Sequence, residues 1–364
     1  MTITFDLTAE LLKPVVARLL SDESVSISSF EVVALKPGAG NPTSLGVYRV
    51  LGLVATEAQD DISFSVVVKH LGDGSPQIDS SAPESWNYWR REIELFESDI
   101  VERIPSHIRY PRYLGQSVLN DGTALFWNAD LGDLAKSTWT WEQCLEAAAL
   151  AADLNAMPTD GFERFEWLNR NQVAGWGEFE KDWLDPYLDQ LRAEADSQAS
   201  LKNQFDAIWP FYIDRSIIEL AMSAGRHGFT HTDFNLNNLM PEAGGIIVLD
   251  WQLAGMGRIG SDVASIFNTA FELDVIEATR PQFEQLCAVY TQRFNEISSQ
   301  PIDLNEVRLA VAITGVFILR WMSFFVFHMK AMATETTIDF EGLVEHIAKS
   351  PMGVYAQVLH ELGL

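Results

Sequence analysis

The chain has 364 residues and carries 51 Asp and Glu against 25 Lys and Arg, a formal net charge of −26. Its hydrophobic fraction of 47% and charged fraction of 21% are ordinary for a folded protein with a large core. So acidic a surface argues against nucleic acid and anionic membranes as partners, because affinity for their phosphates comes from Lys and Arg. A cationic substrate is compatible with the charge, although acidity also serves solubility.

The cysteines and the N-terminus favour a cytoplasmic protein. Cys144 and Cys287 are too few and too far apart for a disulfide framework or a metal-ligand motif. The first residues lack the basic start and apolar run of a signal peptide. The most apolar stretch, residues 309–319, is too short to span a bilayer and ends at Arg320, so we expect a buried core helix there.

The spacing of apolar residues in the first third of the chain predicts a small β-rich part. In chain order we expect a helix over residues 7–20, strands over 30–35, 46–54 and 62–71, a helix over 85–100 and a strand over 124–127. Glycine, proline and polar residues separate the strands, which is typical of an antiparallel meander.

The rest of the chain is predicted to be mainly helical. We expect helices over residues 141–157, 167–191 and 201–224, a β-like run at 246–249, and helices again from 262 to the end. The fold class is therefore α+β with two lobes: a small antiparallel-sheet lobe, residues 1–128, and a larger helical lobe, residues 129–364. A cleft between two such lobes is a natural place for a ligand.

A glycine-containing segment lies between the first two expected strands. Gly38, Gly40 and the nearby Ser44 would allow backbone N–H groups to approach phosphate oxygens closely. The segment does not match G-x-G-x-x-G followed by valine, so a plain hairpin loop is the alternative.

Lys69 ends an apolar strand, as does the kinase lysine that pairs with the α- and β-phosphates. The usual partner of that lysine is a glutamate on the next helix. Glu92 is the better candidate here and Glu94 the alternative, since helical phase does not decide between them. Lysines also end many surface strands, so the interpretation depends on the other motifs.

Residues 231–238 read H-x-D-x-x-x-x-N, the spacing of a kinase catalytic loop. Asp233 can accept a proton from an attacking hydroxyl or orient it, and Asn238 can turn its amide oxygen toward a metal ion. His231 is expected to pack and hold the loop backbone rather than act as an acid. Three fixed residues alone also fit an ordinary polar loop.

Asp250 follows the apolar run 246–249, twelve residues after Asn238. A carboxylate at the end of a buried strand is well placed to bind Mg²⁺, which prefers oxygen ligands. Alone, Asp250 would fit a turn or a helix cap. A loop asparagine, a short hairpin and then a strand-end aspartate is the order in which kinase folds present their metal ligands.

Together these residues resemble the aminoglycoside phosphotransferase-like kinases, a family that includes choline, homoserine and ecdysteroid kinases. The family loop commonly reads H-G-D-x-x-x-x-N and its metal strand V-I-D-W, which correspond to residues 231–238 and 248–251. Residues 40–50 and 250–252 look closer to the ecdysteroid-kinase-like branch. The resemblance covers roughly residues 30–270 and implies a protein-kinase-like two-lobed fold.

The resemblance implies a phosphotransferase that moves the γ-phosphate of ATP, with GTP as the alternative, to a hydroxyl of a small-molecule acceptor. Asp233 would be the catalytic base, and Asn238 with Asp250 would hold Mg²⁺. Lys69 and Glu92 would clamp the phosphates. The segment from Asn128 through Asp130 would hold the adenine through backbone groups, and Asp262 would brace the catalytic loop.

Three departures from the family pattern stand out. Thr232 replaces a common glycine, Ala129 stands where many relatives have glutamate, and Asn155 stands where a helix often carries histidine. None of them removes a phosphate or metal contact, so we expect the chain to be an active enzyme.

Two other functions fit parts of the pattern. A nucleotide-binding regulator without catalysis would share the fold, but here all the catalytic positions are filled. A protein kinase is disfavoured, because neither Asp-Phe-Gly nor Ala-Pro-Glu follows Asp250 and the short segment before Asp262 leaves little room for an activation loop. The acceptor and the oligomeric state are not readable from the sequence. Three tryptophans fit either an acceptor pocket or the core: Trp167, Trp176 and Trp183.

Overall fold

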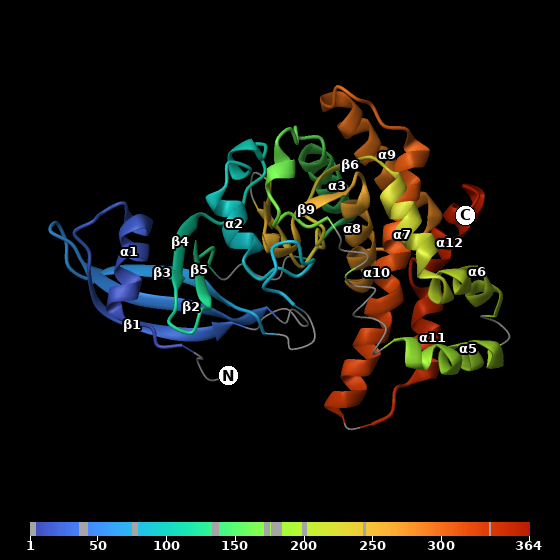
Figure 1. Cartoon of the computed structure of the whole chain (residues 1–364), viewed down its shortest axis with the longest axis horizontal. Coiled ribbons are helices and arrows are strands. Elements are labelled where there is room, and N and C mark those ends of the chain that lie inside the picture. The colour runs from blue at the N-terminus through green and yellow to red at the C-terminus, as the bar shows by residue number, and fades with distance from the viewer. Residues whose placement is uncertain are drawn as a thin grey trace.

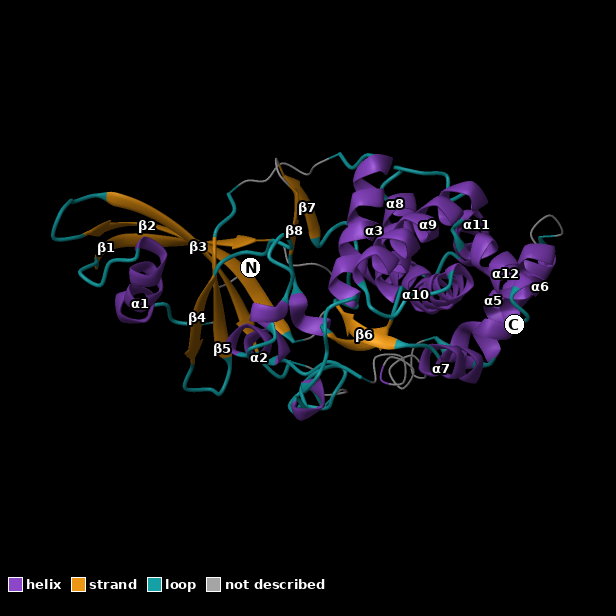
Figure 2. Ribbon diagram, turned by 90° about the horizontal axis from the view of Figure 1, so that it is seen from above, coloured by secondary structure: helices purple, strands orange, loops and turns teal. Residues whose placement is uncertain are grey.

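The computed structural model describes residues 5–35, 43–74, 79–132, 138–170, 175, 184–198, 202–242, 245–334 and 336–364. Within these residues a small antiparallel sheet occupies one end of the molecule and a group of helices the other (Figures 1 and 2). Short strands and the helix α2 lie between them. This arrangement confirms the predicted α+β, two-lobed fold.

The N-terminal sheet has five antiparallel strands in the order β1-β2-β3-β5-β4 among the described residues. Their bounds are β1 Ser26–Leu35, β2 Ser44–Ala55, β3 Ile62–Leu71, β4 Tyr113–Val118 and β5 Ala124–Ala129. Helix α1, Ala9–Leu20, begins at the N-cap Thr8 and buries Leu12 and Val16 against one face of the sheet. On that face alternate strand residues such as Val66 and Val68 are fully buried, which explains the period-two apolar pattern.

Strand β4 is missing from the predicted elements. Gly115 adopts φ +108°, and the β4–β5 register shifts between Tyr113 and Gly115. Such an irregularity breaks the alternation of apolar and polar residues on which strand prediction depends.

Helix α2, Arg91–Glu97, is much shorter than the predicted helix over residues 85–100. The carbonyls of Ser85 and Trp86, which a helix would use within itself, accept hydrogen bonds from the guanidinium of Arg91 instead. Residues 85–90 therefore form turns, and the helix begins only at Arg91. On its sheet side, α2 packs Ile93 against Phe126 of β5.

The C-terminal part is built from helices around one large apolar core. Their bounds are α3 Trp141–Asn155, α5 Leu188–Ser197, α6 Lys202–Ile213, α7 Arg215–Ala224, α8 Ser261–Glu272, α9 Arg280–Ile297, α10 Leu304–Ala333, α11 Phe340–Lys349 and α12 Met352–Glu361. Capping boxes begin α3 at Thr140 and α9 at Thr279. The helix predicted over 201–224 is divided at Asp214, which caps α7.

Helix α10 is longer and more apolar than residues 309–319 suggested. Residues 304–328 include an 18-residue window apolar enough to cross a membrane, but 75% of that window is buried inside the protein. The helix packs against α7, α8, α9, α11 and α12. This packing agrees with the predicted core helix.

Four short strands position the predicted catalytic residues. Strand β6, His227–Thr230, pairs with β9, Gly255–Arg258, and strand β7, Leu239–Glu242, pairs with β8, Gly245–Val248. The loop 231–238 joins β6 to β7, while Asp250 follows β8 and precedes the 3₁₀ turn η4, Trp251–Leu253. The two strand pairs therefore bring the two motifs side by side.

Candidate active site

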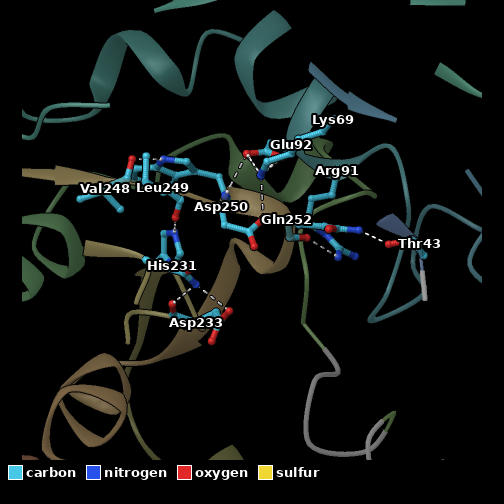
Figure 3. A network of polar contacts seen from close by, with 12 residues as sticks. Thr43, Lys69, Arg91, Glu92, His231, Asp233, Val248, Leu249, Asp250 and Gln252 are labelled. Atoms are coloured by element: carbon cyan, nitrogen blue, oxygen red, sulfur yellow. Dashed lines mark hydrogen bonds and ion pairs between the residues drawn. The ribbon is translucent and has the colours of Figure 1, made fainter. Parts of the chain in front are cut away.

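The Lys69 ammonium lies between two carboxylates from different parts of the chain (Figure 3). It donates to both oxygens of Glu92, at 3.0 and 2.8 Å, and to Oδ1 of Asp250 at 2.9 Å. Glu94 pairs instead with Arg90 on the helix surface. The structure thus decides the partner of Lys69 in favour of Glu92.

These three charges determine one another's protonation. Burial lowers the pKa of Lys69, but the carboxylates of Asp250 and Glu92 outweigh burial and raise that pKa above its usual value. Burial raises the pKa of Asp250, and the adjacent ammonium of Lys69 more than reverses this rise. Lys69 and Asp250 are therefore an ion pair at neutral pH.

The loop 231–238 folds around the carboxylate of Asp233. Asn235 Nδ2 donates to Asp233 Oδ1 at 2.7 Å, and Asn238 Nδ2 donates to Asp233 Oδ2 at 2.8 Å. The second of these bonds uses the amide nitrogen of Asn238 and so leaves its amide oxygen available to a metal ion. Burial, followed by the negative charge of Asp250, raises the pKa of Asp233 to about 7. A carboxyl with a pKa near 7 is well matched to general-base catalysis at neutral pH.

The donor set of this site fits Mg²⁺. In the described part of the chain no group of three or more His, Cys, Asp or Glu side chains is arranged to hold a metal. Mg²⁺ rarely needs such a group, because it is usually held by one or two carboxylates together with waters and substrate phosphates. The carboxylate of Asp250 is 38% exposed, so a cation could reach it. A cation bound there would also reduce the electrostatic repulsion between Asp250 and Asp233.

Asp262, in the first turn of α8, holds the backbone of the loop. Its carboxylate accepts the backbone N–H groups of His231 at 3.1 Å and Thr232 at 2.8 Å. Asn155 donates to the same carboxylate at 3.0 Å, and its own amide oxygen accepts from Tyr290 at 2.7 Å. Asn155 thus completes a buried polar network.

Thr232 adopts φ +63°, a left-handed conformation that is costly for a β-branched residue and free of strain for glycine. Its hydroxyl donates to the carbonyl of His231 at 2.8 Å and also contacts the carbonyl of Leu253. These bonds, with the contact to Asp262, hold the strained residue in place. A residue other than glycine is therefore accommodated at position 232.

His231 is fully buried, and its Nε2 bonds to the carbonyl of Leu249 at 3.0 Å. Its ring packs edge-on against Trp251 and Phe234. Burial lowers its pKa to about 4, so the imidazole is neutral at physiological pH. These contacts agree with the expected structural role.

The burial of His231 predicts a loss of stability in mild acid. Because its folded pKa lies below the unfolded value of 6.5, its contribution is fully present above pH 6.5 and is lost as the pH falls toward 4. Between pH 7 and pH 5 this amounts to about 2 kcal/mol of unfolding free energy. In urea titrations His231→Asn should show a correspondingly shallower pH dependence than the wild type, and the exposed control His360→Asn should not. An equal pH dependence in His231→Asn and wild type would contradict this.

Lys69, Glu92, Asn238 and Asp250 all line one cavity of about 290 Å³ between the sheet and the helical part. Its other described walls come from the sheet, from residues 128–132 at the end of β5 and after it, from α2, from Pro111 before β4 and from the β7–η4 region: Leu35, Val47, Arg49, Val67, Phe96, Pro111, Asn128, Ala129, Asp130, Leu131, Gly132, Met240, Leu249 and Trp251. Charged and apolar side chains therefore both line the cavity.

Only some of the other residues expected to contact the nucleotide line the cavity. Asn128 and Asp130 line the cavity, but the carboxylate of Asp130 already binds Arg49 at 2.9 Å and Ser65, which leaves its backbone as the contacting part. Ser44 begins β2 and is not among the described lining residues, so its expected contact is not found. Gly38 and Gly40 lie outside the described residues.

A second cavity, of about 470 Å³, reaches the catalytic loop and is lined in part by Thr232. Its described walls are mainly from α7, β9 and α10, and include Glu219, Met222, Met256 and Phe317. Trp167 is buried against the core and does not appear among the described lining residues. Trp176 and Trp183 lie outside the described residues.

Residues 136–293 match the model of the phosphotransferase enzyme family. This match includes the loop 231–238, Asp250 and Asp262, but not Lys69 or Glu92. Those two residues are joined to the matched part only by the three-dimensional contacts described above. Among curated protein sequences none matches the chain significantly.

Solved structures of such phosphotransferases are similar to this chain at low identity. An aminoglycoside phosphotransferase from Alicyclobacillus acidocaldarius is 13% identical, with 92% of this chain and 93% of that one covered and a TM-score of 0.51. A choline kinase from Cryptosporidium parvum is 15% identical over 98% and 96%, with a TM-score of 0.48. The GDP complex of wild-type aminoglycoside 2'-phosphotransferase-IIIa is 13% identical over 94% and 99%, with a TM-score of 0.47. At these identities the similarity shows the fold alone.

Two residues of the site were not foreseen from the sequence. Arg91 donates to the backbone of three separate segments, and Gln252 bonds through Nε2 to the hydroxyl of Thr43, next to the glycine-containing segment (Figure 3). The only available signal was position, because Arg91 precedes Glu92 and Gln252 follows Asp250 and Trp251.

Proposed function

We propose that this protein is a small-molecule kinase of the phosphotransferase family that moves the γ-phosphate of ATP to a hydroxyl group. The observation that carries the proposal is the convergence of Lys69, Glu92, Asn238 and Asp250 on one cavity, with Asp233 beside them. An ammonium, a carboxylate and an amide arranged in this way match the parts that phosphoryl transfer requires, which are positioning and neutralisation of charge.

In the proposed reaction the acceptor oxygen attacks the γ-phosphorus as its proton moves to Asp233. An O–P bond forms to the acceptor, the bond between the γ-phosphorus and the β–γ bridging oxygen breaks, and ADP leaves with that electron pair. Lys69, held by Glu92, would bind the α- and β-phosphates. Mg²⁺ bound by Asn238 and Asp250 would neutralise the phosphate oxygens. ATP is the proposed donor and GTP the alternative.

The acceptor is proposed to enter through the second cavity, because that cavity reaches the catalytic loop at Thr232, the neighbour of Asp233 in the chain. Its described walls combine apolar side chains such as Met256 and Phe317 with polar ones such as Glu219, which suits a hydroxylated small molecule. Closer kinship with the ecdysteroid-kinase-like branch is proposed from residues 40–50 and 250–252 alone. The lobe division at residues 128 and 129 and the cytoplasmic location are proposed from the sequence.

The proposal is tested by ADP release from ATP and Mg²⁺ in the presence of a panel of aminoglycosides, amino alcohols, sugars and sterols. We expect at least one class to stimulate release above the rate without acceptor, and excess EDTA to abolish the stimulation. Nucleotide binding in a thermal-shift assay without stimulation by any acceptor would favour the non-catalytic regulator of the same fold.

A further inference from the structure

We propose that Arg91 is a positioning residue that fixes α2 to the η4 turn, so that the Lys69–Glu92 pair is held beside Asp250 before any nucleotide binds. The inference rests on the proposed function and extends it. The Arg91 guanidinium would act on the site through the backbone carbonyls that it binds. The arrangement would then be permanent, rather than formed when substrate arrives.

The Arg91 side chain is fully buried and bonds four backbone carbonyls. Nη2 donates to Ser85 at 2.5 Å, and Nη1 donates to Trp86 at 2.9 Å. Nε donates to Trp167 at 2.6 Å, and Nη1 also reaches Gln252 at 3.1 Å. Ser85 and Trp86 precede α2, whereas Trp167 and Gln252 belong to the helical part. One side chain therefore joins three segments from both parts of the molecule.

No acidic side chain pairs with Arg91 among the described residues, and burial lowers its pKa to about 9. A buried guanidinium without a counter-ion is unfavourable for folding and is tolerated only when its donors are satisfied. A methionine or leucine of similar size would fill the space at lower cost. The arrangement is therefore better explained by what the guanidinium positions than by a contribution to stability.

Arg91 and its neighbour Glu92 both form hydrogen bonds to the backbone of the η4 turn. Glu92 Oε1 accepts the backbone N–H of Trp251 at 3.2 Å while Arg91 donates to the carbonyl of Gln252. Helix α2 has only seven residues, too few to be stable without tertiary contacts. Asp250 directly precedes this turn, so the bonds from Arg91 and Glu92 to the turn set the distance between the Glu92 and Asp250 carboxylates. The Lys69 ammonium lies between these carboxylates and bonds to both (Figure 3).

Lysine should not replace Arg91. Its ammonium is a compact point charge with three donors, whereas the planar guanidinium has five donors in a fixed fork that spans separate carbonyls. Arg90 provides a matched control, because it is the adjacent residue of the same type, is partly exposed, and its described side-chain contacts, with Tyr88, Trp89, Glu94 and Gln116, all lie within the N-terminal part.

The test compares Arg91→Lys, Arg91→Met and Arg90→Lys with the wild type by hydrogen exchange and by turnover. Without nucleotide, peptides covering residues 92–97 should be as protected in the wild type as they are with nucleotide. They should exchange faster in Arg91→Lys but not in Arg90→Lys. Turnover in Arg91→Lys should fall about 10- to 100-fold in kcat, the range typical of residues that orient a catalytic group. Combined with Glu92→Gln, Arg91→Lys should add little further loss, since both act through Glu92.

Three results would overturn the proposal. One is a wild-type helix α2 that becomes protected only when nucleotide is added. Another is an Arg91→Lys protein with unchanged exchange and kcat. The third is a loss in the double variant equal to the product of the two single losses, which would indicate a merely structural role. The hydrogen-exchange measurements do not depend on turnover. They would therefore still test the role of Arg91 if the proposed function were wrong.

Discussion

Replacing Asp233 with asparagine is expected to lower kcat by about 10²- to 10⁴-fold, the usual contribution of a positioned general base. The amide keeps the shape of the carboxylate but cannot take the proton of the acceptor hydroxyl. Because Lys69, Asn238 and Asp250 remain, nucleotide binding should change much less than turnover. The measurement is acceptor-stimulated ADP release at saturating nucleotide, with KM determined separately.

A control within the same loop guards against a purely structural loss. Asn237 is exposed, and its backbone N–H rather than its side chain bonds to Asn235. Asn237→Ala should therefore turn over at nearly the wild-type rate. If kcat were unchanged in Asp233→Asn, Asp233 would not be the general base. A loss confined to nucleotide affinity would indicate that the variant disturbs Asn238 instead.

Replacing Asp250 with asparagine is expected to lower kcat/KM for Mg²⁺-ATP by at least about 10²-fold. A metal-bound carboxylate supports charge stabilisation of several kcal/mol, and each 1.4 kcal/mol corresponds to about tenfold in rate. The substitution also removes the ion pair that holds Lys69 at 2.9 Å. Turnover measured across a Mg²⁺ titration should show a much higher Mg²⁺ requirement than the wild type.

The exposed residue Asp303, at the start of α10, offers a matched substitution. Asp303→Asn changes the net charge by the same amount as Asp250→Asn and should leave the Mg²⁺ titration unchanged. If both variants shifted it equally, the effect would come from overall charge rather than from a ligand. An Asp250→Asn protein with the wild-type Mg²⁺ requirement would exclude Asp250 as the metal ligand.

Much of the fold was predictable because the information is local. The strands over 46–54 and 62–71 are rich in β-branched and other apolar residues and are bounded by glycine and polar residues, and β2 and β3 follow them closely. The catalytic loop was predictable because Asp233 and Asn238 lie only five residues apart and meet through two hydrogen bonds from the Asn238 amide. In such cases spacing along the chain nearly fixes distance in space.

The parts that were missed depend on contacts between distant segments. Helix α2 starts late because the side chain of Arg91 takes the carbonyls that a longer helix would use. No periodicity in the sequence records that competition. The choice of Glu92 over Glu94 likewise depends on which helix face meets Lys69 and Trp251, and those residues lie 23 and 159 positions away.

Asp130 shows a different limit of prediction from sequence. Its position after β5 correctly indicated the wall of the cavity, but its carboxylate binds Arg49 and Ser65 in the sheet. A sequence pattern can place a residue at a site without showing whether its side chain or its backbone faces the ligand.

The fate of the γ-phosphate tests the central claim most directly. The protein would be incubated with Mg²⁺ and ATP labelled at the γ-phosphorus, together with pooled hydroxylated acceptors, and the products separated. We predict label in an organic phosphoester, with ADP formed in equal amount, and formation of this product slowed by at least about 100-fold in Asp233→Asn. Label that stays in ATP, or appears only as inorganic phosphate with every acceptor pool, would contradict it.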